Sequence, residues 1–378
     1  MSILTKLIDT LTLQFKVNPQ NKRIIFEDFK NGIICNSKRK WKCRTMHKPV
    51  VNYKAKFYGK HIHIPLNYDR FYYKAYKFSA GVDGYTIYYS HYKYRDDYVC
   101  VTLQHKVIEE KTCKQIYEDA VIILDSIGIN TSLLELDDRL NRIDLKWDYK
   151  ARNILEINAF FNAISKSRDS FNSIDKINYT TAIKYKPVGS STEIIIYDKW
   201  AEMNARKKKR SHVDLDISIY ENVIRTEIRL KSKRLYNNSQ GKMGLRKNLS
   251  EYFNEKVIDE CFKKYVEPIF YSEPFFRIDY AIIAITHNDS LTEIEKEKLC
   301  YLVTEINKKG YSEAKRTYKY CDDTFDKHIN LLRKIGINPL TFNKNFDIGI
   351  IPNFTKKEPI EYLENEEKYI LEEVGDIF

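Results

Sequence analysis

Three short strand-like segments, each gathering charged residues on one face, restrict the fold more than any other feature of the sequence. They are residues 142–148 (RIDLKWD), 193–199 (EIIIYDK) and 223–231 (VIRTEIRLK). Successive side chains of a β-strand point to opposite faces, so this spacing predicts one apolar and one charged face for each strand. If the three strands are neighbours, their apolar faces form part of a core and their charged faces form one surface.

The charged faces carry residue types that suit phosphodiester chemistry. They hold Arg142, Asp144, Lys146 and Asp148 from the first segment, Glu193, Tyr197 and Lys199 from the second, and Arg225, Glu227, Arg229 and Lys231 from the third. Asp144 and Glu227 are hard oxygen ligands suited to Mg²⁺ or Mn²⁺, and such a cation polarises a scissile phosphate. We therefore predict a metal-assisted site with these two carboxylates as ligands.

Tyr197 is the candidate nucleophile of this site, and it would form a covalent phosphotyrosine. An unperturbed tyrosine has a pKa of about 10, so it needs a nearby cation or base. Lys199 lies two residues on and is expected on the same face, where it can stabilise a developing phenoxide or phosphorane charge. Glu202 follows where the strand gives way to a helix or loop, and it is a candidate third ligand or general base.

The alternative interpretation of the same face is structural. Charges on neighbouring strands commonly pair with one another, each pair contributing roughly 0.2–1 kcal/mol, on a face that is open to solvent. Adjacency of the three strands is the assumption on which the catalytic interpretation depends.

The rest of the chain predicts an α+β fold, with a central, mostly antiparallel sheet flanked by helices and a mainly helical C-terminal region. Strands are expected at 10–17, 54–64, 85–92, 98–103, 142–147, 193–198 and 223–230, and helices at 114–126, 153–165, 249–265, 291–309 and 324–334. Ser290 and Glu293 have the spacing of a capping box, and Gly310 follows as a stop. We predict a catalytic domain over residues 1–240, a helical DNA-binding domain over 241–355, and an acidic tail over 356–378.

The charge distribution favours a polyanionic partner. The chain of 378 residues has a net charge of +12, although residues 358–378 hold eight acids against one lysine. The remainder is therefore strongly basic, and basic surfaces bind phosphates with release of counterions. Seven cysteines without a CxxC pair argue against a disulfide framework and a zinc finger, and no apolar run spans a bilayer. We expect a soluble, cytoplasmic protein that binds DNA and no membrane.

Basic clusters mark the expected DNA contacts. The run 206–210 (RKKKR) is interpreted as an exposed loop between two strands, and 38–48 (KRKWKCRTMHK) interleaves basic residues with a tryptophan. A purely solvated surface is the alternative for both, and 315–319 (KRTYK) is a third basic cluster. The candidate DNA-binding residues are Arg142, Arg225, Arg229, Lys207, Lys208, Lys209, Arg210, Lys38, Arg39 and Lys40.

His61 and His63 form a second candidate metal site. Two residues apart on one strand, their imidazoles would face the same side. Two ordinary histidines in an aromatic-rich strand are the structural alternative.

Four places in the chain carry a family resemblance. They are 7–15 (LIDTLTLQF), 142–145 (RIDL), the Tyr-x-Lys-x-x-Glu pattern at 197–202, and 225–230 (RTEIRL). Their order and spacing resemble the gene II/gene X type of filamentous-phage and plasmid replication proteins, and more distantly plasmid initiators of the Rep_trans type. Residues 330–338 (NLLRKIGIN) are similar to a C-terminal segment of gene X type proteins.

The resemblance implies a rolling-circle replication initiator. Such a protein nicks one strand of an origin, forms a 5′-phosphotyrosine, releases a 3′-OH primer and later rejoins the strand. By resemblance Tyr197 is the nucleophile, Asp144 and Glu227 hold Mg²⁺ or Mn²⁺, and Lys199 and Glu202 support catalysis. Origin DNA, single-stranded or supercoiled duplex, is the expected partner, with a host helicase and a second copy of the chain as further candidates. Tyr185, Tyr220 and Tyr236 remain open as assistants at termination.

Two other functional classes fit parts of the pattern. A non-enzymatic DNA-binding regulator would use the same basic surface without cleavage. A tyrosine recombinase also forms a phosphotyrosine, but it uses an Arg/His cluster without a metal and places its nucleophile near the C-terminus.

Overall fold

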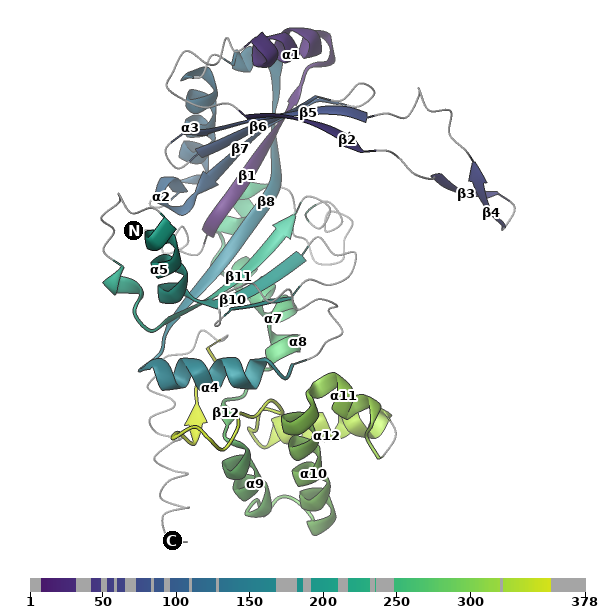
Figure 1. Cartoon of the computed structure of the whole chain (residues 1–378), viewed down its shortest axis with the longest axis vertical. Coiled ribbons are helices and arrows are strands. Elements are labelled where there is room, and N and C mark those ends of the chain that lie inside the picture. Colours follow the sequence, from purple (N-terminus) through teal and green to yellow (C-terminus); the bar gives the residue numbers. More distant parts are fainter. Residues whose placement is uncertain are drawn as a thin grey trace. The chain divides into compact units, whose positions relative to one another are not determined.

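A computed structural model shows the chain as β-strands and α-helices (Figure 1). The described residues are 8–31, 42–48, 53–57, 60–64, 73–82, 85–91, 96–108, 111–126, 129–167, 182–185, 192–209, 217–231, 235, 248–319 and 322–354. They divide into two compact units, Met1–Leu145 with Leu230–Val257, and Lys146–Arg229 with Ile258–Phe378. The α+β fold class is as predicted. The domain boundary expected near residue 240 stays a prediction.

The first unit is built on an antiparallel sheet in the order β2-β5-β6-β7-β1-β8. Its strands are β1 (Ile8–Val17), β2 (Lys42–Lys48), β5 (Tyr73–Val82), β6 (Tyr85–His91), β7 (Tyr98–Gln104) and β8 (Leu134–Lys150). The run predicted as one strand at 54–64 contains two strands, β3 (Tyr53–Phe57) and β4 (Lys60–Ile64), which pair as a hairpin. Aromatic and β-branched composition indicates strand but does not show where a strand turns.

The apolar face of this sheet forms the core of the first unit. Alternate residues of β1 (Leu11, Leu13 and Phe15) lie opposite Leu103, Val101 and Val99 of β7, and all of them are buried. Helix α3 (Cys113–Ser126) buries Ile116, Ala120 and Leu124, the face that its period of 3.6 predicts. The remaining helices of the unit are α1 (Lys22–Asn31), α2 (His105–Ile108) and the short 3-10 helices η2 (Pro19–Asn21), η5 (Thr131–Leu133) and η9 (Leu249–Phe253).

The strands of the second unit lie in the order β8-β11-β10-β9, with β8 represented by its last residues, 146–150. It contains β9 (Ala182–Tyr185), β10 (Thr192–Asp198), β11 (Val223–Lys231), α4 (Ile154–Ile164), α5 (Lys199–Lys209) and the 3-10 helix η7 (Ser218–Tyr220). The three charged strands of the sequence are therefore consecutive, as the catalytic interpretation requires. Asn153 caps α4 through its side chain, so the helix predicted at 153–165 is confirmed.

The rest of the second unit is mainly helical. It holds α7 (Glu255–Tyr265, whose first turn belongs to the first unit), α8 (Glu267–Phe270), α9 (Ile278–Thr286), α10 (Glu293–Lys309), α11 (Tyr311–Arg316), α12 (Asp322–Lys334) and a small sheet of β12 (Phe275–Phe276) with β13 (Ile350–Ile351). Phe160 of α4 packs edge-on against Phe275 and Phe354, with ring centroids 5.5 and 5.1 Å apart. No helix within the described segments is long and apolar enough to cross a membrane.

Two local predictions are wrong. The capping box of α10 is formed by Thr292 and Glu295, not by Ser290 and Glu293. Ser290 instead bonds the side chain of Asn288, 2.5 Å away, in the preceding turn. The basic run expected as a loop continues α5 as far as Lys209, because Asp198 caps this helix and Lys and Arg are good helix formers. Gly310 does end α10, with φ of 80°.

Candidate active site

Tyr197 and Glu227 meet on neighbouring strands of the second unit. Tyr197 is the last residue but one of β10, and its hydroxyl donates a 2.5 Å hydrogen bond to Oε1 of Glu227 in the middle of β11. Glu227 is 6% exposed and Tyr197 is half-buried. A short bond between a phenol and a buried carboxylate is of the charge-assisted kind. The structure thus gives the predicted nucleophile a direct proton acceptor.

Lys199 reaches the same place from the first turn of a helix. Asp198 accepts a 3.0 Å hydrogen bond from the backbone N–H of Ala201 and so starts α5 directly after β10. Lys199 is therefore helical rather than the end of a strand. Its buried ammonium lies 5.6 Å from the ring centroid of Tyr197 and donates a 2.8 Å bond to Glu202. Tyr197, Lys199, Glu202 and Glu227 are brought together in one cluster.

Tyr220 is the assistant tyrosine that the described structure places in this cluster. The Lys199 ammonium lies 5.5 Å from its ring centroid, so the lysine contacts both aromatic rings. Tyr185 lies in β9, paired with Ile194, and its side chain is outside the described residues, as is Tyr236.

Trp200 is a surface feature that the sequence reasoning did not single out. It follows Lys199 in α5 and is 43% exposed, and Ile219, beside Tyr220, is 65% exposed. Exposed aromatic rings stack on bases in single-stranded nucleic-acid sites. The signal in the sequence was a tryptophan directly after the candidate lysine.

The other charges of the face pair across strands. Arg225 makes two 2.6 Å bonds to the carboxylate of Asp148, and Arg229 bonds Glu193 at 3.1 Å. This pairing is what the structural interpretation expects, but the face is mostly buried rather than solvated. Arg225 is 4% exposed, so its guanidinium presents little surface to DNA.

Asp144 belongs to the first unit and is 1% exposed. Nε of Arg142 donates to its Oδ1 at 2.7 Å, and Nη2 of Arg142 donates to its Oδ2. Each carboxylate oxygen has two lone pairs, so the two bonds from Arg142 leave acceptor positions open on Asp144. A metal role for Asp144 stays a prediction.

Asp9 is a carboxylate near Asp144 that the sequence reasoning missed. Ile8 pairs with Leu145 and Thr10 with Asp144, so the register shifts at Asp9. A β-bulge of this kind re-aims a side chain and is common beside functional sites. The described residues contain no group of three or more His, Cys, Asp or Glu side chains that could hold a metal. Asp9 and Asp144 are a pair on neighbouring strands.

The basic clusters and the two histidines predicted from the sequence are described only in part by the structure. Lys207, Lys208 and Lys209 lie in α5, but their side chains, and all of Lys38, Arg39, Lys40 and Arg210, are outside the described residues. His61 and His63 occupy alternate positions of β4, opposite Lys56 and Lys54, and nothing further tests them as ligands. In the third basic cluster Lys315 pairs with Asp326 at 2.8 Å and Arg316 with Glu313 at 2.6 Å, so these cations are partly neutralised.

No protein-family model matches the chain, and no curated protein matches it significantly.

Proposed function

We propose that the protein is a metal-dependent DNA nicking enzyme of the rolling-circle initiator type, with Tyr197 as its nucleophile. The observation that carries the proposal is the 2.5 Å hydrogen bond from the Tyr197 hydroxyl to Glu227. A tyrosine at neutral pH needs a base, and a buried carboxylate at hydrogen-bond distance is placed to act as one. This geometry favours Glu227 as proton acceptor over the metal ligand role expected from the sequence.

The proposed step transfers a phosphoryl group to the phenol. The Tyr197 oxygen attacks the scissile phosphorus while Glu227 takes the phenolic proton. The bond from phosphorus to the 3′ oxygen breaks, the 3′ oxygen takes a proton from solvent, and the 5′ end stays bonded to Tyr197. Lys199 offsets the negative charge of the phosphorane, and Glu202 holds the ammonium in position. A Mg²⁺ or Mn²⁺ ion would supply further charge neutralisation, and Asp144 stays the ligand predicted from the sequence.

Rejoining reverses the first step, since a 3′-OH attacks the phosphorus and the Tyr197 oxygen leaves, and a second nucleophile is needed to cut a regenerated origin. Tyr220 is our candidate for that role, because Lys199 contacts its ring as closely as that of Tyr197. Trp200, which is exposed on α5 and follows Lys199 in the chain, is our candidate for stacking on a base near the scissile phosphate. The proposed partner is origin DNA, and the proposed compartment is the cytoplasm.

A covalent-adduct assay tests the proposal. Supercoiled plasmid carrying the DNA around the coding region, and end-labelled single strands from it, are incubated with protein and Mg²⁺ or Mn²⁺. We expect nicked circles and an adduct that peptide mapping assigns to Tyr197. Tyr197→Phe should abolish the adduct, and Glu227→Gln should slow it by about 10²–10⁴-fold, the usual contribution of a general base. Tyr280→Phe, a half-buried tyrosine of α9, is the matched control.

A DNA-binding regulator without cleavage is the second candidate. The observation in its favour is the pairing of Arg225 with Asp148 and of Arg229 with Glu193. These ion pairs explain the charges of the face by stability alone, without catalysis. DNA binding without nicked circles, equal in the original protein and in Tyr197→Phe, would establish the regulator and exclude the enzyme.

A further inference from the structure

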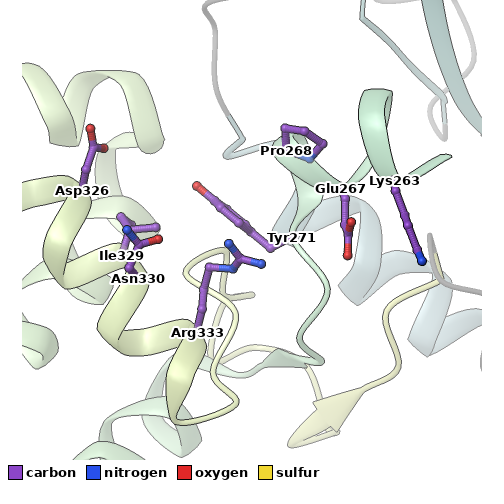
Figure 2. A pocket seen from close by; sticks show the side chains of 8 residues that line it. All are labelled: Lys263, Glu267, Pro268, Tyr271, Asp326, Ile329, Asn330 and Arg333. Atoms are coloured by element: carbon purple, nitrogen blue, oxygen red, sulfur yellow. The ribbon is translucent and has the colours of Figure 1, made fainter. Parts of the chain in front are cut away.

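A pocket of about 380 Å³ lies in the helical part of the second unit, between α7–α8 and α12 (Figure 2). The residues that line it are Lys263, Glu267, Pro268, Tyr271, Asp326, Ile329, Asn330 and Arg333. None of them belongs to the Tyr197 cluster. Pockets of this size hold small organic molecules that are bound by apolar walls and a few polar groups.

The charges around the pocket balance. Lys263 and Arg333 are cations, and Glu267 and Asp326 are carboxylates. A phosphate placed inside would approach both carboxylates, so the interior does not suit an anion. It suits a neutral group that presents hydrogen-bond donors and acceptors along its edge.

The walls suit a flat, partly apolar group. Pro268 is exposed and supplies aliphatic surface, and Ile329 and Tyr271, each 3% exposed, add small apolar areas to the lining. Asn330 is exposed on α12, and its amide offers both a donor and an acceptor. An amide of this kind bonds two atoms of a base edge at once.

The backbone at Tyr271 is held in a conformation that a tyrosine rarely adopts. Its φ is 60° and its ψ is −164°, a region occupied almost entirely by glycine and costing a side-chain-bearing residue of the order of 1–3 kcal/mol. Two buried asparagines fix this turn. Asn338 donates to the carbonyls of Phe270 and Glu273, and Asn353 donates to the carbonyl of Tyr271 at 3.2 Å.

The guanidinium of Arg333 is fixed beside the same ring. It lies 5.3 Å from the Tyr271 ring centroid, and its Nε is 3.2 Å from both carboxylate oxygens of Glu273. Figure 2 shows Tyr271 reaching toward α12 with Arg333 beside it. Strain that is held in place by surrounding bonds is typical of binding sites whose shape is formed in advance.

We propose that this pocket binds one nucleobase of unpaired DNA. The inference rests on the proposed function in one respect, namely that the nucleic acid bound by the protein is DNA. The base enters between the apolar walls, Asn330 and Arg333 bond its edge, and Lys263 lies at the rim, where the neighbouring phosphate passes. The pocket would hold a displaced single strand at a point separate from the nucleophile.

Binding of matched single strands tests the proposal. Fluorescent oligonucleotides of one length, made as dA, dC, dG and dT homopolymers and as an abasic strand, are titrated with the full chain. The abasic strand keeps the phosphates and removes the bases. We expect at least one base-bearing strand to bind more tightly than the abasic strand. Asn330→Leu should lower the affinity for that strand by about 5- to 100-fold, which is the range for one bidentate base contact. It should leave the affinity for the abasic strand unchanged.

Asn158→Leu, an exposed asparagine on α4, is the matched control and should change neither affinity. Asn330 is exposed, so its replacement keeps the fold, which thermal unfolding verifies. Equal effects of Asn330→Leu and Asn158→Leu, or equal binding of base-bearing and abasic strands, overturn the pocket proposal. If no Tyr197 adduct forms, the nicking function is rejected. If Asn330→Leu nevertheless binds the base-bearing strand more weakly, the pocket proposal still holds.

Discussion

Lys166 is a half-buried lysine whose amine is held by three neutral oxygens. Its Nζ donates to the side chains of Asn162 and Asn343 and to the carbonyl of Thr341, at 3.1, 2.8 and 2.8 Å. Burial lowers its pKa to about 7. An unfolded lysine titrates near 10.4, so between these values the unfolded chain binds more protons than the folded one.

The free energy of unfolding should therefore rise as the pH is raised from about 7 towards 10.4. We expect about 2–4 kcal/mol of this rise to come from Lys166 and to be missing in Lys166→Met. Urea unfolding of both proteins at pH 6, 8 and 10 measures the difference, with the exposed Lys308→Met as control. Parallel pH dependences in the original protein and Lys166→Met would contradict the assignment.

The ion pair of Arg225 with Asp148 makes a second prediction at this scale. Arg225 is buried, whereas the side chain of Asp148 is 36% exposed, so solvent partly screens the pair. Asp148→Asn removes the charge of the carboxylate, and we expect it to lower the free energy of unfolding by about 1–2 kcal/mol. Glu118→Gln removes a carboxylate from an exposed pair with Lys114 and should cost less than about 0.5 kcal/mol. Similar small losses in both variants, measured by denaturant unfolding, would show that the pair is unimportant.

The residues of the candidate site were predictable, but their contacts were not. The alternation of side chains along a strand predicted that Tyr197 and Glu227 lie on the charged faces. Because β10 and β11 are neighbouring strands, the two residues come together. That the carboxylate receives the tyrosine proton depends on register, which alternation does not encode. Asp9 was missed for the same reason, because a register shift beside Thr10 leaves no mark in the sequence pattern.

At the scale of elements, the start of α10 offers a direct test of a cap. Thr292 accepts from the Glu295 N–H, and Glu295 accepts from the Thr292 N–H. Thr292→Ala should lower the free energy of unfolding by about 1 kcal/mol, the usual value for a lost N-cap. Ser290→Ala, two residues earlier and outside the helix, is the control and should cost less. A larger loss from Ser290→Ala would restore the capping box expected from the sequence.

Several elements with a clear period were predicted, but the amphipathic helix α1 was missed. Helix α3 and strands β7, β10 and β11 show 3.6 or 2 periodicity and were found. Helix α9 is apolar on almost every side, as in Ala281 to Ile285, so its sequence does not distinguish helix from strand. The basic end of α5 was mistaken for a loop because charge was read as exposure, whereas Lys and Arg also favour helix.

For the whole molecule, the uneven charge predicts how the acidic tail affects DNA binding. The tail, residues 358–378, opposes the basic remainder of the chain. Replacing it with a neutral Gly/Ser segment of equal length should tighten binding to a random duplex by on the order of 10-fold at 50 mM salt. The difference should shrink towards 200 mM, as screening increases. Fluorescence anisotropy measures both affinities, and identical salt curves would exclude an electrostatic role for the tail.

The first unit is assembled from two stretches of chain that synthesis produces far apart in time. Residues 230–257 belong to it and bury Leu235, Leu249 and Tyr252, yet residues 146–229 of the other unit are made before them. Domains normally fold as they leave the ribosome, the N-terminal one first. Here the first unit stays incomplete until residue 257 has emerged, so the packing of η9 against α3 forms late. Translation speed across residues 146–257 is therefore expected to influence how much of the protein a cell recovers in its native form.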